Sequence, residues 1–403
     1  MLDNLVFLVF SKIKLQLKYF ILILLSWTVP IVASAQFDYE LTFQDMDKLG
    51  LLPDNFISAM EMDDHGVLWI ATNDGLCRYD SPNSVSVFRK GDIGIESDII
   101  RTLENGSDST LWIGTTFGGV TSYNYFTDES KTYLDTGSGS NRLSDNEILS
   151  LAEVSPEEIW IGSERGLDVL FPAEDSIYSF NSANNSGTMI EGSILNIFVD
   201  QRSWIWISTW GHGLYLYLPD PSGRHDRGSF RQILIPGFDG ASNIWDIEQH
   251  DSHHYWLATH DGGLGYMSVP DGGSLAQNKQ EWSPKFEFYT TKETNLTLNY
   301  LTDLAYDNDN NLWISTNNGL NILTKEQIDS IEWKKPDSQN TIKFYSYYHR
   351  PQITTSLNNN NITSLLVDKQ GLVWIGSSSG INQYNELNNS CLLYTSPSPR
   401  DRG

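Results

Sequence analysis

A nine-residue motif, LWIATNDGL at residues 68–76, recurs six more times along the chain and limits the possible folds more than any other feature. Every copy has a tryptophan at its second position, and these are Trp69, Trp112, Trp160, Trp206, Trp256, Trp313 and Trp374. Successive tryptophans are 43, 48, 46, 50, 57 and 61 residues apart, close to the roughly 40–50 residues of one β-propeller blade. The 403 residues are therefore expected to contain one repeat structure rather than several unrelated domains.

The repeats keep a common register on both sides of the tryptophan. Isoleucine or leucine stands twelve positions before it in all seven units, and another apolar residue stands nine positions before it. Four units carry Asp six positions before the Trp, where its side chain can cap a tight turn: Asp63, Asp200, Asp307 and Asp368. A glycine follows the motif centre in every unit, where a second hairpin turn is expected. The short β-branched and aromatic segments between these turns predict four antiparallel strands per unit.

The two ends of the repeat region predict a closed ring. The seventh unit has a third strand, INQYNEL, but no convincing fourth one. The segment from Tyr39 to Phe43 resembles the end of a blade and can supply that strand, which removes an exposed sheet edge. The predicted fold is all-β: a seven-bladed β-propeller of four-stranded antiparallel blades, spanning residues 36–387 and closed by an N-terminal strand.

Both termini differ from the repeats. Residues 1–35 combine lysines, a short apolar run and the small-residue site Ala33–Ala35, which is typical of a secretory signal peptide; an uncleaved N-terminal anchor is the alternative. Residues 388–403, NNSCLLYTSPSPRDRG, break the repeat and resemble read-through of non-native sequence at a truncated gene end, with a native disordered tail as the alternative.

Composition narrows the possible partners. The formal charge is −25, and an acidic surface repels phosphate backbones, so direct nucleic-acid binding by this segment is not expected. Only two cysteines occur, Cys77 and Cys391, so no disulfide framework is predicted despite the export signal.

The pattern I-x-x-L/I-x-x-D-x-x-G-x-L-W-I-G-T-x-x-G-L, nearly complete at residues 57–76 and 301–320, resembles the two-component regulator propeller repeat. The resemblance implies the periplasmic sensor region of a hybrid histidine kinase system. It implies an oligosaccharide ligand and a signal that crosses the membrane to regulate transcription. Membrane attachment would come only through a C-terminal region beyond this chain, and a homodimer could form through the full-length receptor. Kinase function does not carry over, because no phospho-acceptor His region or nucleotide-binding Gly motif follows the repeats.

The variable centres of the seven motifs are the predicted ligand site, because the turns between second and third strands open on one face of a propeller. Aromatic rings can stack on sugars while polar side chains bind hydroxyls, and a concave mouth is the usual shape of a site. The candidate residues are Asp74, Phe117, Arg165, Trp210, His212, His260 and Asn317. Ordinary solvent-facing hairpin turns are the alternative reading, and Trp210 is the strongest candidate.

Metal and catalytic motifs are weak. His250, His253 and His254 lie at the opposite face from His260 and match no zinc spacing, and DNDNN at Asp307 lacks the rest of a calcium loop. No metal, cofactor or catalytic centre is predicted. A propeller lyase acting on glycans remains an alternative, with Glu164, Asp74, His212 and His260 as its only acid or base candidates, and a protein-interaction scaffold is another.

Overall fold

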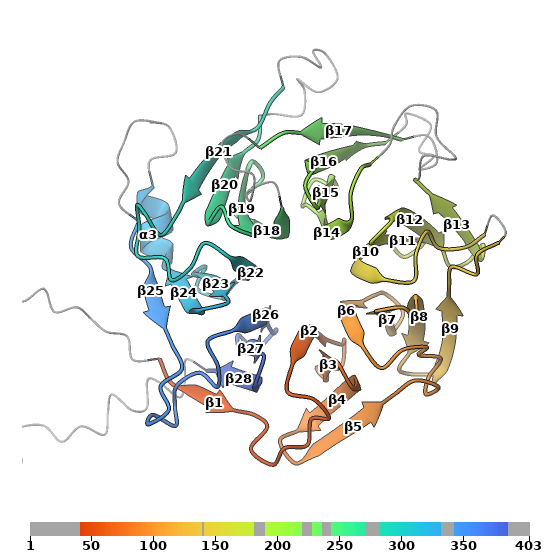
Figure 1. Cartoon of the computed structure of the whole chain (residues 1–403), viewed down its shortest axis with the longest axis horizontal. Coiled ribbons are helices and arrows are strands. Elements are labelled where there is room, and N and C mark those ends of the chain that lie inside the picture. Colours follow the sequence, from red (N-terminus) through yellow and green to blue (C-terminus); the bar gives the residue numbers. More distant parts are fainter. Residues whose placement is uncertain are drawn as a thin grey trace, which may run out of the picture. The chain divides into compact units, whose positions relative to one another are not determined.

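The computed structural model describes residues 41–138, 141–180, 190–219, 228–235, 243–270, 282–331 and 342–385. The predicted leader at 1–35 and the tail at 388–403 lie outside these residues. The unit that begins at Thr42 forms seven four-stranded antiparallel sheets arranged around a centre (Figure 1). The predicted seven-bladed propeller is confirmed. No helix in the described part of the chain has the length and apolar character of a membrane span.

The first strand of each blade faces the centre of the ring, and the other three follow outward (Figure 1). The first strands are β2 (Ile57–Met62), β6 (Ile100–Asn105), β10 (Ile148–Ser155), β14 (Ile194–Val199), β18 (Ile244–Gln249), β22 (Leu301–Tyr306) and β26 (Ile362–Val367). The second strands are β3 (Leu68–Thr72), β7 (Thr110–Thr115), β11 (Glu158–Ser163), β15 (Ile205–Thr209), β19 (His254–Thr259), β23 (Leu312–Thr316) and β27 (Val373–Ser377). The second strands carry the motif tryptophans.

The outer half of each blade contains the third and fourth strands. The third strands are β4 (Gly75–Ser81), β8 (Val120–Asn124), β12 (Gly166–Phe171), β16 (Gly213–Leu218), β20 (Leu264–Ser268), β24 (Gly319–Leu323) and β28 (Gly380–Tyr384). The fourth strands are β5 (Ser84–Phe88), β9 (Glu129–Tyr133), β13 (Ser176–Ser179), β17 (Ser229–Ile233), β21 (Lys285–Tyr289), β25 (Tyr345–Tyr347) and, for blade seven, β1 (Phe43–Asp45). One short helix, α3 (Lys325–Ser330), follows β24.

The motif tryptophans fill the space between neighbouring blades. All seven are at most 6% exposed, and Trp69, for example, packs with Ile100, Ile113 and Tyr123 of the next blade. At the closure, Trp374 packs with Ile57 and other core residues of blade one in the same way. Burying a ring of this size contributes several kilocalories per mole (about 3–5 kcal/mol on truncation to alanine), which explains the fixed frame of the repeat.

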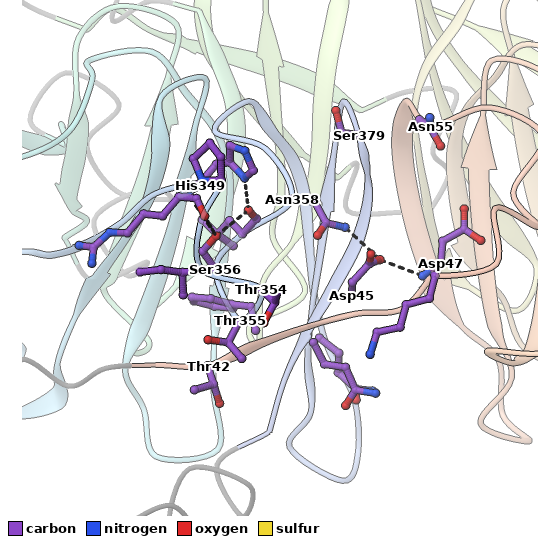
Figure 2. Close-up of a pocket in the computed structure, with 18 of the residues that line it drawn as sticks. Thr42, Asp45, Asp47, Asn55, His349, Thr354, Thr355, Ser356, Asn358 and Ser379 are labelled. Atoms are coloured by element: carbon purple, nitrogen blue, oxygen red, sulfur yellow. Dashed lines mark hydrogen bonds between the residues drawn. The ribbon is translucent and has the colours of Figure 1, made fainter.

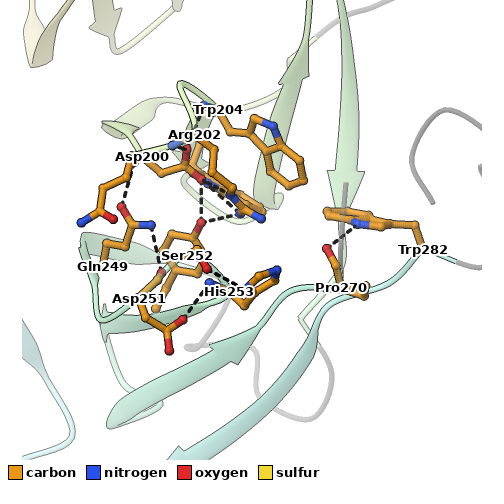
Figure 3. Close-up of polar contacts among 12 residues, drawn as sticks. Asp200, Arg202, Trp204, Gln249, Asp251, Ser252, His253, Pro270 and Trp282 are labelled. Atoms are coloured by element: carbon orange, nitrogen blue, oxygen red, sulfur yellow. Dashed lines mark hydrogen bonds and ion pairs between the residues drawn. The ribbon is translucent and has the colours of Figure 1, made fainter. Parts of the chain in front are cut away.

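The aspartate six positions before the tryptophan holds both the turn and the ring. In blade four, Asp200 Oδ1 accepts the backbone N–H groups of Arg202 (2.8 Å) and Trp204 (2.9 Å). Its Oδ2 accepts Trp206 Nε1 (3.2 Å) and the Tyr255 hydroxyl of the next blade (2.6 Å). Figure 3 shows this network. The other three aspartates make the same bond to their own tryptophans: Asp63 to Trp69 (3.1 Å), Asp307 to Trp313 (2.8 Å) and Asp368 to Trp374 (3.0 Å).

Two blades that lack this aspartate obtain a partner from the next blade. In blade five the position is His250, and Trp256 Nε1 donates instead to the Tyr306 hydroxyl (2.7 Å), which also bonds His250 Nδ1 (2.8 Å). In blade two the position is a glycine, and the turn N–H of Ser107 donates to the carboxylate of Glu153 (2.9 Å). The ring of blade five and the turn of blade two are therefore anchored across blades, whereas the Trp112 ring nitrogen has no hydrogen-bond partner among the described residues.

The ring closes as predicted, with the strand displaced slightly along the chain. The prediction placed it from Tyr39 to Phe43, whereas β1 begins at Phe43 and pairs with β28; Tyr39 lies outside the described residues. Phe43 is 3% exposed, and its ring lies 5.8 Å from Tyr347 and 6.3 Å from Tyr384. Its burial explains why the pairing is centred here.

A groove of about 1060 Å³ lies beside the closure (Figure 2). Its polar groups mostly bond one another: Asn358 Nδ2 donates to Asp45 Oδ1 (3.2 Å), and the Ser356 hydroxyl donates to the Arg350 carbonyl (3.0 Å). The first bond joins β1 to the long connection between β25 and β26, and the second lies within that connection. They give the groove a structural role in closing the ring.

Candidate functional site

A β-bulge re-aims one side chain per blade toward the centre of the ring. In all seven first strands the pairing register shifts between the twelfth and tenth residues before the tryptophan. The residue skipped by the ladder is the bulged one, and such an extra residue turns its side chain away from the regular pleat. These seven residues are Ser58, Arg101, Leu149, Leu195, Trp245, Thr302 and Thr363. All of them line a central cavity of about 450 Å³.

The next residue of each first strand forms a second ring of lining residues: Ala59, Thr102, Ser150, Asn196, Asp246, Asp303 and Ser364. Several buried polar atoms of this cavity have no hydrogen-bond partner among the described residues, namely Asn196 Oδ1, Ser364 Oγ and Asn361 Oδ1. Ser364 is only 5% exposed. Because unpaired buried polar atoms are rare in native proteins, a cavity that collects them is suited to a polar ligand.

Asp246 and Asp303 lie side by side in the wall of this cavity. The backbone N–H of Leu304 donates to both carboxylates, at 3.1 Å to Asp246 and 2.9 Å to Asp303, and Asn196 donates to Asp246 (3.2 Å). Burial raises the pKa of Asp246, and burial together with the neighbouring Asp246 charge raises the pKa of Asp303 well above its ordinary value. Both shifts favour the protonated form, and a protonated carboxyl can both donate and accept hydrogen bonds.

Three glutamates further along the first strands also have raised pKa values. Burial, aided by the charge of Glu104, raises the pKa of Glu61 to about 8. Burial likewise raises the pKa of Glu104 to about 7 and that of Glu248 to about 8. The inner strands thus contain less negative charge at neutral pH than their sequence indicates.

Four rings gather at the mouth of the cavity, on blades four to six. The Trp210 ring lies 5.2 Å from His260 and 6.0 Å from Trp245, and His260 lies 4.5 Å from Tyr300. Trp245 and Tyr300 line the cavity, while Trp210 is 44% exposed. The four residues, called the aromatic cluster below, form an apolar surface that continues from solvent into the polar cavity.

The structure places three of the predicted residues at this mouth. Trp210 and His260 belong to the aromatic cluster, and Asn317 lines the cavity itself. They come from the turns of blades four, five and six, which are neighbours in the ring (Figure 1). These three candidates are brought together by the fold.

The other four predicted residues do not line the cavity. Three of them pair locally: Asp74 with Arg89 (2.9 Å), Arg165 with Asp145 (3.1 Å) and His212 with Glu191 (3.2 Å). The Arg89 hydrogen bond lowers the pKa of Asp74. Phe117 is 71% exposed and has a φ of +68°, a conformation unfavourable for a bulky side chain. Only the turns of blades four, five and six therefore place a predicted residue at the cavity mouth.

Three residues at the mouth were not predicted from the sequence: Arg101, Trp245 and Tyr300. Arg101 and Trp245 are bulged residues, and a bulge cannot be recognised from the motif. One signal was present, however. The positions ten and eleven before the tryptophan vary in charge and size between two fixed apolar positions, just as the motif centre does.

The histidine and aspartate clusters have structural partners. His250 bonds Tyr306, and His254 contacts Asp251 (2.8 Å). Asp307 accepts the backbone N–H of Asn311 (2.8 Å) in addition to the Trp313 ring. Within the described ranges, no three His, Cys, Asp or Glu side chains are grouped to hold a metal ion.

Comparison with known proteins places this geometry in context. A family model described as the two-component regulator propeller matches residues 51–74, 295–318 and 356–379. A histidine kinase, P4, of Formosa agariphila is 26% identical over 329 residues, which is 81% of this chain and 21% of that kinase. This chain thus spans about a fifth of the length of that relative.

Solved structures show the same fold. The extracellular domain of the hybrid two-component system BT3049 of B. thetaiotaomicron matches with a TM-score of 0.65 and 18% identity, covering 86% of this chain and 42% of that one. Virginiamycin B lyase of Staphylococcus aureus matches with a TM-score of 0.57 and 12% identity, covering 86% and 98%. At these identities the likeness concerns the fold alone, whereas the repeat matches concern the sequence. The sevenfold repeat and the three matching segments together show that this chain carries two-component regulator propeller repeats.

Proposed function

We propose that this propeller is the ligand-sensing part of a hybrid two-component system, exported to the periplasm, and that it binds an oligosaccharide at the mouth of its central cavity. The observation that carries the proposal is the aromatic cluster at the rim of a polar cavity. Trp210 and Trp245 lie 6.0 Å apart at that rim. Rings of this kind stack on the apolar faces of sugars, while the unpaired atoms below can bind hydroxyl groups.

The size of the cavity fits this ligand class. A volume of about 450 Å³ lies within the roughly 300–1,000 Å³ of small-molecule sites. The residues of the cavity come from all seven first strands, so a ligand that enters it contacts every blade. Binding there would alter the packing between blades, and the proposed signal to the attached kinase begins with that change.

The test is calorimetric titration of the chain with oligosaccharide pools released from different polysaccharides. One pool is expected to bind, and Trp210→Ala and Trp245→Ala should each weaken it by roughly tenfold to a hundredfold, as for buried aromatic anchors at interfaces. Trp204→Ala is the matched control, because Trp204 lies in the turn of Asp200 at the opposite end of blade four and should leave affinity unchanged. Absence of binding by every pool, or unchanged affinity in both mouth variants, would refute the proposal.

The alternative of a glycan lyase gains no support from the geometry. Two of its four acid or base candidates, Asp74 and His212, pair with Arg89 and Glu191, and neither lines the cavity. Incubation of the chain with the same polysaccharides should release no unsaturated product. The titration also distinguishes a ligand sensor from a protein-interaction scaffold, because a scaffold needs no small ligand and should bind none of the pools.

A further inference from the structure

The bulged residues of the seven first strands differ in what they do for the ring. Three of them have hydroxyl groups that donate to a backbone carbonyl of the next blade: Ser58 to Ile100 (2.6 Å), Thr302 to Ile362 (2.8 Å) and Thr363 to Ile57. These bonds join neighbouring blades and close the ring between blades seven and one. A short hydroxyl side chain at this position therefore has a structural role.

Arg101 occupies the same position in blade two and has no such role. Its side chain is exposed, and it forms no ion pair or hydrogen bond within the described ranges. It is also the only lysine or arginine among the described residues that line the cavity. In a chain with 51 acidic and 26 basic residues, a cation left unpaired beside a cavity is unusual, since acidic partners are abundant.

Arg101 faces the aromatic cluster across the cavity. It belongs to β6 of blade two, whereas Trp245 belongs to β18 of blade five, and blades three steps apart in a ring of seven lie on nearly opposite sides (Figure 1). Both are bulged residues, so they lie at the same level of the cavity. The charge of Arg101 extends to Tyr300 of the cluster, where it opposes the effect of burial on the pKa of that tyrosine.

We infer that the oligosaccharide bound at this mouth has an anionic group, a carboxylate or a sulfate ester, which binds the Arg101 guanidinium while a sugar ring stacks on Trp245 and Tyr300. This inference rests on the proposed function and specifies its ligand. A planar guanidinium binds carboxylate and sulfate oxygens with two parallel hydrogen bonds. Burial raises the pKa values of Asp246 and Asp303, which lessens the repulsion that an anion meets in the cavity.

The test compares each binding pool with the same pool after carboxyl reduction and after desulfation, titrated against the unaltered chain, Arg101→Met and Arg101→Lys. Loss of the anionic group should weaken binding to the unaltered chain about tenfold or more, as for a charge-assisted hydrogen bond. Weaker binding after carboxyl reduction would identify the anion as a carboxylate, and weaker binding after desulfation would identify it as a sulfate ester. Arg101→Met should bind treated and untreated pools equally, and Arg101→Lys should recover part of the difference.

Arg89→Met is the control for net charge, because Arg89 lies on the same face but pairs with Asp74; it should preserve the preference for the untreated pool. Unfolding temperatures equal to that of the unaltered chain would show that each variant is folded. Equal affinity of the unaltered chain for treated and untreated pools would overturn the inference and leave the proposed function standing. Binding of no pool at all would refute the proposed function and this inference with it.

Discussion

Asp200 offers the sharpest test of how the blades are held together. Its side chain is fully buried, and it accepts two backbone N–H groups, the Trp206 ring nitrogen and the Tyr255 hydroxyl. In Asp200→Ala the two side-chain donors, on residues that are both 0% exposed, lose their acceptor inside the core. Each orphaned donor costs about 1–3 kcal/mol, and Arg202 loses its ion-pair partner as well.

The expected loss in the free energy of unfolding is therefore about 3–5 kcal/mol, the size seen when one partner of a buried pair is removed. The assay is urea unfolding followed by circular dichroism, with the midpoint and slope compared between variants. Asp309→Ala is the matched control, because Asp309 is an exposed aspartate in the corresponding turn of blade six and should change stability by less than about 0.5 kcal/mol.

Asp200→Asn separates the two functions of this carboxylate. The asparagine oxygen can still cap the turn, but its amide NH₂ cannot accept from Trp206 and Tyr255. The loss of unfolding free energy in Asp200→Asn should lie between the losses in Asp309→Ala and Asp200→Ala. A loss below about 1 kcal/mol in Asp200→Ala would refute the reasoning, because the two donors would then have found other acceptors at little cost.

Three further predictions follow from the contacts of single residues. Phe43→Ala should destabilise the closure by about 3–5 kcal/mol, whereas Phe126→Ala should have almost no effect, since these rings are 3% and 78% exposed. Gly263→Ala should cost clearly more than Gly66→Ala. The φ values are nearly equal, +77° at Gly263 and +79° at Gly66. An added Cβ would lie 2.3 Å from a backbone carbonyl oxygen at Gly263, whereas it would meet nothing within 4 Å at Gly66. Glu61→Gln should raise the unfolding temperature at pH 8 and leave it nearly unchanged at pH 4.5, because the folded-state pKa of about 8 exceeds the unfolded value near 4.3.

The sign of the pH effect follows from proton binding. Between about pH 4.5 and 8 the folded chain retains a proton on Glu61 that the unfolded chain has released, so stability falls as pH rises through that window. Glutamine has no such proton, and the variant therefore lacks this loss. The Glu61 prediction would be contradicted if the unaltered chain gained stability through Glu61 from pH 5 to pH 8. The other two predictions would be contradicted if the two glycine substitutions, or the two phenylalanine substitutions, cost the same free energy of unfolding.

Sequence periodicity predicted the scaffold because its determinants repeat locally. The tryptophan, the apolar residues before it and the turn glycine lie within about twenty positions of one another, and each copy confirms the next. Even the capping role of Asp63 and its equivalents could be inferred from turn chemistry. The bond from each of these aspartates to the tryptophan ring was not inferred, although it also lies within one repeat.

The site depended on features that no single repeat contains. Only three of the seven predicted residues, Trp210, His260 and Asn317, lie at the cavity mouth, because which turns lean toward the centre depends on neighbouring blades. Arg101 and Trp245 enter the cavity through a bulge, which reverses the direction that strand alternation would assign to a side chain. The repeat by itself determined the ring of seven blades, since burial of the tryptophans requires a neighbour on each side. Only the closed ring decided which side chains meet at its centre, because those residues are distant in sequence and adjacent only across blades.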